Sequence, residues 1–178
     1  LVSPQVNYTD RDSHFIFGDV ATATILETAE TVNTDTAFDI LSTKAKTMYS
    51  NNIRSNFGYM SRANDADPFG PDKLFHQAGR RVFKEVCPMA AEHIASHLGQ
   101  HELTPNKVNR WWLHQANINM NTLICKKLLG RDANSEEAPI VLDEYANTAS
   151  AGSIIAFALH HEDLASQDVG VICSFGAG

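Results

Sequence analysis

The sequence predicts an α/β domain in which helices are layered against a sheet. Short continuous apolar runs alternate along the chain with segments in which apolar residues recur every three or four positions. The first pattern is typical of buried strands and the second of amphipathic helices, and their alternation favours a layered α/β architecture. With 178 residues, 43% of them hydrophobic and 20% charged, the chain can form the core of one domain or a large part of one.

The N-terminal third is predicted to hold three short strands and a long loop. Residues 14–18 (HFIFG) indicate a buried strand, residues 18–27 (GDVATATILE) a turn and a second strand, and residues 38–43 (FDILST) another strand. Residues 48–71 are rich in Asn, Ser, Gly, Asp and Pro, which predicts a loop. Loops of that length inside a compact domain are usually functional or mobile.

Helices and strands alternate in the rest of the chain. Helices are predicted over residues 73–98, 117–129 and 150–159, and strands over residues 108–113, 140–142 and 169–175. Pro88 lies inside the first helix and predicts a kink there, because proline has no amide proton to donate. Gly130 is expected to end the second helix, since glycine commonly follows a helix C-terminus.

The charge, the cysteines and the chain ends restrict the class of protein. A net charge of −7 argues against general nucleic-acid binding, no apolar run is long enough to span a bilayer, and we expect no signal peptide. The cysteines, Cys87, Cys125 and Cys173, have neither disulfide-framework nor zinc-site spacing, so we expect reduced thiols in a cytoplasmic protein. Because the chain begins at Leu1 and ends at Gly178 in an apolar segment, we expect a fragment, a processed product or an incompletely ordered chain.

His114 and Asn147 are the leading candidate site residues. Each stands at the end of an extended segment and just before a predicted helix, the position where α/β folds place ligands and chemistry. The positive end of each helix favours a neutral imidazole, and a neutral His and an Asn can together donate hydrogen bonds to one oxyanion. Taken singly, each residue also has a purely structural interpretation: His114 can make a structural hydrogen bond, and Asn147 can be a helix N-cap.

The order of the motifs around this pair resembles a known family. HQAN at 114–117, ANTASAGSI at 146–154 and SFGAG at 174–178, with RDSHFIFGDVATATILE at 11–27 and GRRVFKEV at 79–86, resemble the C-terminal half of β-ketoacyl-acyl-carrier-protein synthase III, in the thiolase superfamily. The resemblance covers nearly the whole of residues 1–178. It implies half of a five-layer αβαβα fold: one mixed sheet flanked by helices.

The resemblance also implies a reaction. The family uses a Cys-His-Asn triad whose His and Asn match His114 and Asn147, while its Cys lies in the N-terminal half. That Cys takes an acyl group from acyl-CoA, and the His and Asn stabilise the enolate formed when malonyl-acyl-carrier protein loses carbon dioxide. The implied partners are the chain's own N-terminal half, a second copy in a homodimer, acyl-CoA and acyl-carrier protein. No cofactor is expected, because CoA and phosphopantetheine thioesters are the substrates.

Further residues match family positions by resemblance alone. The FGGG turn matches Phe175, Gly176 and Ala177, where the backbone N–H at Ala177 would join a second oxyanion hole. Gly79 matches a glycine beside the pantetheine tunnel, although the Asn after it is Arg80 here. The family's GDGAGA turn is GDVATA at residues 18–23.

Basic residues of this chain match the family's carrier-docking surface. Lys84, Lys126 and Lys127 match basic positions there, whereas an Arg that normally follows HQAN is Asn119 here. For Lys126 and Lys127, a solvated helix face is the competing interpretation. Carrier docking is therefore expected to be weaker or rearranged.

Two alternatives stay open, and a metal site is not expected. His93, His97 and His101 lie four residues apart, but the ligand set is incomplete and Gly99 is expected to end the helix before His101. The chain could belong to a non-catalytic partner subunit of a thiolase-fold heterodimer, or to another acyl-CoA condensing or acyl-transfer enzyme of the superfamily. The residue at the family's cysteine position discriminates the enzyme from the partner subunit.

Overall fold

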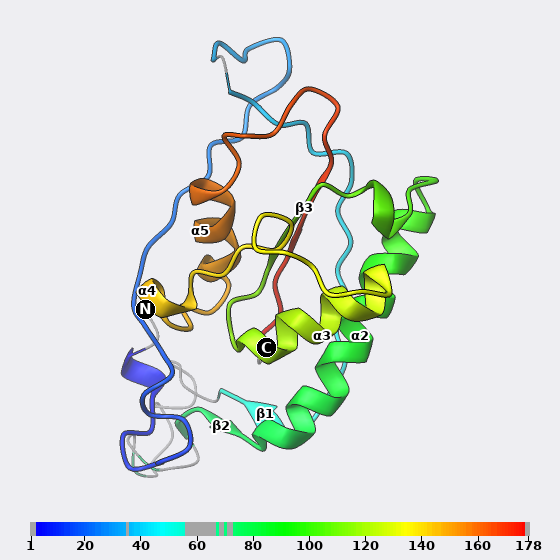
Figure 1. Cartoon of the computed structure of the whole chain (residues 1–178). Helices are drawn as coiled ribbons and strands as arrows, with labels where there is room; N and C mark the ends of the chain where they lie inside the picture. The colour runs from blue at the N-terminus through cyan, green and yellow to red at the C-terminus, as the bar shows by residue number, and fades with distance from the viewer. Residues whose placement is uncertain (1–2, 35, 56–66, 68–69, 71–72, 177–178) are drawn as a thin grey trace.

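A parallel pair of strands lies between helices in the centre of the molecule (Figure 1). The computed structural model describes residues 3–34, 36–55, 67, 70 and 73–176. Strands β3 (Arg110–Leu113) and β4 (Gly170–Cys173) pair in parallel, with Leu113 opposite Cys173. Helices α2 (Gly79–Gly99) and α3 (Ile118–Leu129) lie on one side and α5 (Ala151–Leu159) on the other. The predicted α/β class is confirmed.

Strand β3 contributes to two hydrophobic clusters because successive side chains of a strand point to opposite faces. Trp111 and Leu113 pack in the cluster formed with α2 and α3, where they are 1% and 2% exposed. Trp112 packs in the second cluster with Ile155 and Ala156 of α5. All four residues of β3 are buried. His114, which follows the strand, is therefore attached to a buried strand end.

The helix predictions hold where local sequence signals define the ends. Helix α3 begins after Asn117, whose side chain accepts a hydrogen bond from the Asn119 N–H at 2.8 Å, as N-cap residues do. It ends at Gly130, which has a left-handed φ of 71°, as predicted. Helix α5 begins at Ala151, one residue later than predicted, while α2 begins at Gly79 rather than at residue 73 and continues through Pro88.

Four predicted strands are wrong. Residues 18–27 and 38–43 form no strand, and residues 14–18 form only one parallel bridge, from Phe17 to Asn147. Side chains of these segments, such as Ile25, Ile40 and Leu41, are more than 60% exposed. An extended segment becomes a strand only when a neighbour accepts its backbone hydrogen bonds and covers its apolar face, and the described residues provide no such neighbour. Residues 140–142 instead lead into the short helix α4 (Leu142–Tyr145).

The expected single mixed sheet is also absent from the described ranges. They contain two separate two-stranded sheets, β3–β4 and an antiparallel pair formed by β1 (Ile53–Arg54) and β2 (His76–Gln77). Strand β1 lies inside the predicted 48–71 loop, most of which is outside the described residues. The described residues also form two short 3₁₀ turns, Ser3–Gln5 and Pro105–Lys107. No helix in this part of the chain is long and apolar enough to cross a membrane.

Candidate active site

His114 follows β3 directly and is buried. It is 5% exposed, and within the described part of the chain its buried Nδ1 has no hydrogen-bond partner. Its carbonyl accepts a hydrogen bond from the Ala116 N–H at 3.1 Å, so the chain turns sharply here. Burial lowers the pKa of His114 to about 4, because an imidazolium is poorly solvated in the interior. The imidazole is therefore neutral at physiological pH.

Phe175 covers the imidazole. It lies two residues after β4, and the ring centroids of His114 and Phe175 are 4.4 Å apart with the planes tilted by 54°. Because β3 and β4 are parallel and in register, the two residues leave the same edge of the sheet. Ser174, which precedes Phe175, is held by a 2.7 Å hydrogen bond between its hydroxyl and that of Ser153 in α5. The sequence-predicted Phe175 is thus placed against His114.

Asn147 is held by the backbone of residues 16–18. Its N–H donates to the Ile16 carbonyl at 2.9 Å, and its carbonyl accepts from the Gly18 N–H at 3.0 Å. Its side-chain Oδ1 accepts from the Ala149 N–H at 3.0 Å, which is the Asx turn typical of Asn before a helix. With Oδ1 used in this way, the Nδ2 donor has no partner among the described residues. Asn147 is 8% exposed, and its Nδ2 is not among the fully buried side-chain atoms that lack a partner, so this donor is open to water.

The backbone on both sides of Asn147 is strained. Ala146 has φ 57° and ψ −160°, and Ala149 has φ 55°. L residues avoid these conformations, and the first one is adopted almost only by glycine. Non-glycine residues in such regions cost about 1–3 kcal/mol each and often occur at functional sites. The strained residues therefore lie in the same turn as Asn147, which the sequence analysis names as a candidate site residue.

The turns that carry His114 and Asn147 converge. Gln115 follows His114, Thr148 follows Asn147, and both side chains approach Gly152 in the first turn of α5. A Cβ on Gly152 would lie 2.8 Å from Gln115 Cβ and 3.3 Å from Thr148 Oγ1. The two exits thus meet at one point on α5.

The remaining predicted site residues lie in three places. Gly79 and Lys84 line a hollow of about 310 Å³ at the start of α2, together with Arg80 and Phe83. Gly176 is exposed beside Phe175, and Ala177 lies outside the described residues.

Lys126 and Lys127 are in the last turn of α3. Lys126 is 3.5 Å from the Asp132 carboxylate, and both side chains are more than half exposed. This favours the solvated helix face for Lys126.

The histidines of α2 hold a neighbouring segment. His93 Nε2 is 3.2 Å from the Lys44 carbonyl and His97 Nε2 is 2.9 Å from the Ser42 hydroxyl, while the His97 and His101 rings are 5.4 Å apart. Within the described ranges, no group of three His, Cys, Asp or Glu side chains is arranged to hold a metal. His93 and His97 therefore contact residues 42–44, and the His101 ring packs against that of His97.

The cysteines are poor nucleophiles. Cys87 and Cys125 are buried and Cys173 is half-buried. Burial raises the pKa of Cys87 and raises those of Cys125 and Cys173 to about 11. Because the thiolate is the reactive form, burial favours the less reactive thiol form in all three.

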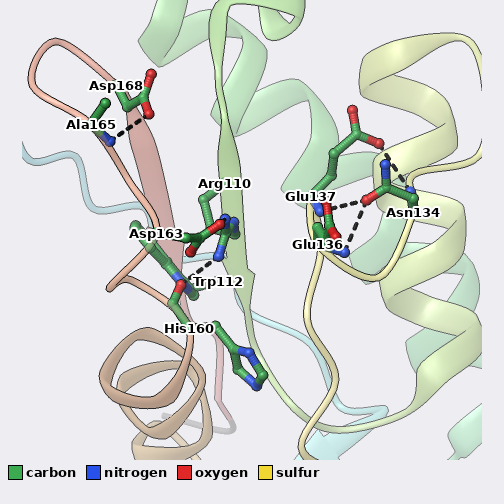
Figure 2. Close-up of polar contacts among 9 residues, drawn as sticks. All are labelled: Arg110, Trp112, Asn134, Glu136, Glu137, His160, Asp163, Ala165 and Asp168. Carbon is green, nitrogen blue, oxygen red and sulfur yellow. Dashed lines mark hydrogen bonds and ion pairs between the residues drawn. The ribbon is translucent and has the colours of Figure 1, made fainter.

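Two buried polar residues, one at the start of β3 and one directly after His114, were not predicted from the sequence. Arg110 at the start of β3 donates to the His160 carbonyl at 2.7 Å and to the Asp163 carboxylate at 2.6 Å, and Trp112 Nε1 donates to the same carbonyl at 3.1 Å (Figure 2). Gln115 is fully buried. The available signal was the same for both: a polar residue in or beside an apolar run must find partners in the interior.

Comparisons with known proteins agree on one family. A family model described as 3-oxoacyl-[acyl-carrier-protein (ACP)] synthase III C terminal matches residues 98–178. The chain is 55% identical over 183 residues to a β-ketodecanoyl-[acyl-carrier-protein] synthase of Pseudomonas aeruginosa, covering 100% of this chain and 52% of that protein. It is 30% identical over 185 residues to a β-ketoacyl-[acyl-carrier-protein] synthase III of Mycobacteroides abscessus, covering 99% of this chain and 51% of that protein.

A solved structure supports the fold. The crystal structure of a 3-oxoacyl-(acyl-carrier-protein) synthase III matches 71% of this chain and 40% of its own, with a TM-score of 0.59 and 18% sequence identity. The chain spans about half the length of the curated relatives it matches.

Proposed function

The chain belongs to the β-ketoacyl-acyl-carrier-protein synthase III family of thiolase-like condensing enzymes, as their C-terminal domain, and from this we propose that it supplies the enolate-stabilising half of a decarboxylating condensation site. The reaction joins an acyl group from acyl-CoA to malonyl-acyl-carrier protein in fatty-acid or related biosynthesis. A Cys thiolate attacks the acyl-CoA carbonyl and CoA leaves, which gives an acyl-enzyme.

The second half-reaction is assigned to His114 and Asn147. The bond between the malonyl carboxylate and the α-carbon breaks, and carbon dioxide leaves. The electron pair of the broken bond stays on the α-carbon and forms an enolate on the carrier thioester. The enolate oxygen accepts hydrogen bonds from the two side chains. Its carbon then attacks the acyl-enzyme carbonyl and expels the Cys thiolate, which gives the β-ketoacyl product.

The observation that carries this assignment is the buried, neutral His114 beside the convergence point shared with Asn147. A neutral imidazole offers an N–H without the cost of a buried cation. The Nδ2 of Asn147 is a second donor without a partner in the described residues. Preorganised donors contribute most where charge develops, and losing one typically costs about 3–4 kcal/mol of barrier.

The nucleophile is proposed to come from the protein's own N-terminal half. Cys87, Cys125 and Cys173 are unsuitable because burial raises their pKa values. The same half would cover the exposed apolar residues of segments 18–27 and 38–43 and complete the αβαβα fold. The 178-residue chain alone is expected to be inactive.

The substrate surface is proposed to lie at the start of α2 and around Phe175. Gly79 and Lys84 border the hollow on α2, which suits a pantetheine arm entering beside a basic residue. Ala177 is the proposed backbone donor to the acyl thioester. Lys126 and Lys127 remain weaker candidates for carrier docking. A homodimer and a cytoplasmic location stay predictions.

The primer is proposed to be of medium length. The Pseudomonas aeruginosa relative is named for a β-ketodecanoyl product. Since malonyl extension adds two carbons, that product corresponds to an octanoyl primer. We therefore expect octanoyl-CoA to be preferred over acetyl-CoA.

The decisive experiment is intact-mass analysis of the complete gene product incubated with an acyl-CoA panel and then with malonyl-acyl-carrier protein. We expect one cysteine outside residues 1–178 to be acylated and a β-ketoacyl product to form. His114→Ala and Asn147→Ala should acylate normally but lose decarboxylation. If no acyl-CoA labels the protein, the enzymatic proposal is wrong and the non-catalytic partner subunit takes its place. If labelling occurs without malonyl decarboxylation, another acyl transfer of the superfamily is indicated.

A further inference from the structure

We propose that Gln115 is a positioning residue that sets the spacing between the His114 turn and the Asn147 turn. The proposal rests on the proposed function, because it assigns Gln115 a part in aligning the two enolate donors. Gln115 does not touch the reacting atoms in this account. It acts through the backbone segments to which its amide is bonded.

The Gln115 amide is fully buried and uses both of its ends. Its exposed fraction is 0%. Nε2 donates to the Leu113 carbonyl at 2.9 Å and to the Pro139 carbonyl at 3.4 Å, while Oε1 accepts from the Val141 N–H at 3.1 Å. Every partner is a backbone group. The side chain therefore ties the end of β3 to residues 139–141 in one orientation only, because a flipped amide would oppose donor to donor and acceptor to acceptor.

Gln115 continues a pairing that the backbone cannot complete. The Trp111 N–H donates to the Glu137 carbonyl at 2.7 Å, so residues 137–141 start out alongside β3 like an edge strand. Pro139, two residues after Glu137, has no N–H, so it cannot continue this backbone pairing with β3. The Gln115 amide supplies the missing donor and acceptor at that point. The chain can thus leave β3 at His114 with the Leu113 and Pro139 carbonyls and the Val141 N–H paired.

Residues 131–137 make this support rigid. The Glu137 carboxylate accepts hydrogen bonds from the Arg131 guanidinium and from the Asn134 N–H. Asn134 Oδ1 accepts from the Glu136 and Glu137 N–H groups (Figure 2). These bonds lower the pKa of Glu137 to about 2, chiefly through Arg131. The segment that Gln115 binds is therefore held in place from its other end.

The opposite face of Gln115 sets the position of α5. Gly152 lies so close that a Cβ there would be 2.8 Å from Gln115 Cβ and 3.1 Å from Gln115 Cγ. Helix α5 begins four residues after Asn147. The stem of Gln115 thus limits how closely the helix that follows Asn147 approaches the strand that carries His114. The Gln115 amide therefore fixes the turn at His114, and its Cβ and Cγ set the distance to the helix that follows the turn at Asn147.

The test compares Gln115→Leu with Trp112→Phe in the complete gene product. Gln115→Leu keeps the volume near Gly152 but removes all three hydrogen bonds. Trp112→Phe removes one buried hydrogen bond, to the His160 carbonyl, from the same strand, and serves as a stability control. For each protein, malonyl-carrier decarboxylation, cysteine acylation and the thermal midpoint are measured.

For Gln115→Leu we expect decarboxylation kcat to fall about tenfold to a hundredfold, since small misplacements of catalytic groups have effects of this size. Its KM and the acylation rate should change little. Trp112→Phe should lower the midpoint and leave the ratio of decarboxylation to acylation unchanged. Gln115→Glu should lose decarboxylation at neutral pH and regain part of it as the pH falls, because a protonated carboxyl can again donate one hydrogen bond.

Two results would overturn the proposal. One is a Gln115→Leu protein whose decarboxylation and acylation fall in the same proportion, as after general destabilisation. The other is a crystal structure of that variant in which the His114 and Asn147 side chains keep their wild-type separation and orientation. The structural measurement needs no activity. A wild-type protein that is neither acylated nor decarboxylating therefore refutes the proposed function, while the variant's structure still decides the positioning role.

Discussion

The ring of Phe175 lies against the imidazole of His114, with 4.4 Å between the centroids. The two residues come from the ends of neighbouring parallel strands, so the sheet itself brings them together. An apolar ring at this distance excludes water from one face of the imidazole. It thereby contributes to the burial that lowers the pKa of His114 to about 4.

Phe175→Ala should therefore raise the pKa of His114 towards its ordinary value. Removing the ring admits water, which solvates the imidazolium. The titration of His114 can be followed by NMR of the imidazole resonances, with His114→Asn used to assign the signal. Phe15→Ala is a matched control, because Phe15 is 67% exposed and should not affect the titration. An unchanged His114 pKa in Phe175→Ala would show that the rest of the site alone excludes water.

The buried His114 should make the protein less stable at acidic pH. Its ordinary pKa is 6.5 and its folded pKa is about 4, so between these values the unfolded chain binds a proton that the folded chain does not. Stability then falls as the pH drops through this window, by about 2–3 kcal/mol between pH 7.5 and 4.5. Denaturation of wild type and His114→Asn at both pH values should show that the variant lacks this part of the loss. Equal losses in the two proteins would contradict the assigned pKa.

Relief of strain beside Asn147 should be measurable. Ala146→Gly removes a strain of about 1–3 kcal/mol, which exceeds the roughly 0.5–1 kcal/mol that added backbone freedom costs. We expect the variant to be as stable as wild type or about 1 kcal/mol more stable. Ala95→Gly, on the exposed face of α2, is the control and should lose about 1 kcal/mol. Equal destabilisation by both changes would argue against strain at Ala146.

Gly170 is predicted to tolerate no side chain. A Cβ at this first residue of β4 would lie 2.1 Å from Cζ3 of Trp112, and the indole is locked in place by its hydrogen bond to the His160 carbonyl. Gly170→Ala should cost about 1–3 kcal/mol through overpacking. Gly99→Ala is the control, since nothing lies within 4 Å of its Cβ position. Thermal unfolding of both variants would measure the difference, and a neutral Gly170→Ala would mean that the ring moves freely.

The sequence predicted an element correctly where the residues that define its ends lie within or next to that element. Helix α3 has its N-cap at Asn117 and its left-handed end at Gly130, and both are visible in the sequence because capping involves only neighbouring residues. The apolar run before His114 likewise predicts β3. The N-terminal strands failed for the opposite reason. Residues such as Ile25 and Ile40 are apolar enough for strands, but strand formation requires a partner that the described residues do not contain.

The sequence by itself determined the order of the helices, the family, and the two residues whose chemistry suits an enolate. Those properties follow from residue type and spacing along the chain. The tertiary structure decided what surrounds them: the burial that keeps His114 neutral, the Asx turn that leaves one donor of Asn147 open, and the buried Gln115 between the two turns. These features depend on contacts between residues far apart in sequence, such as Gln115 with Val141 and with Gly152, and packing of that kind leaves no local periodicity to read.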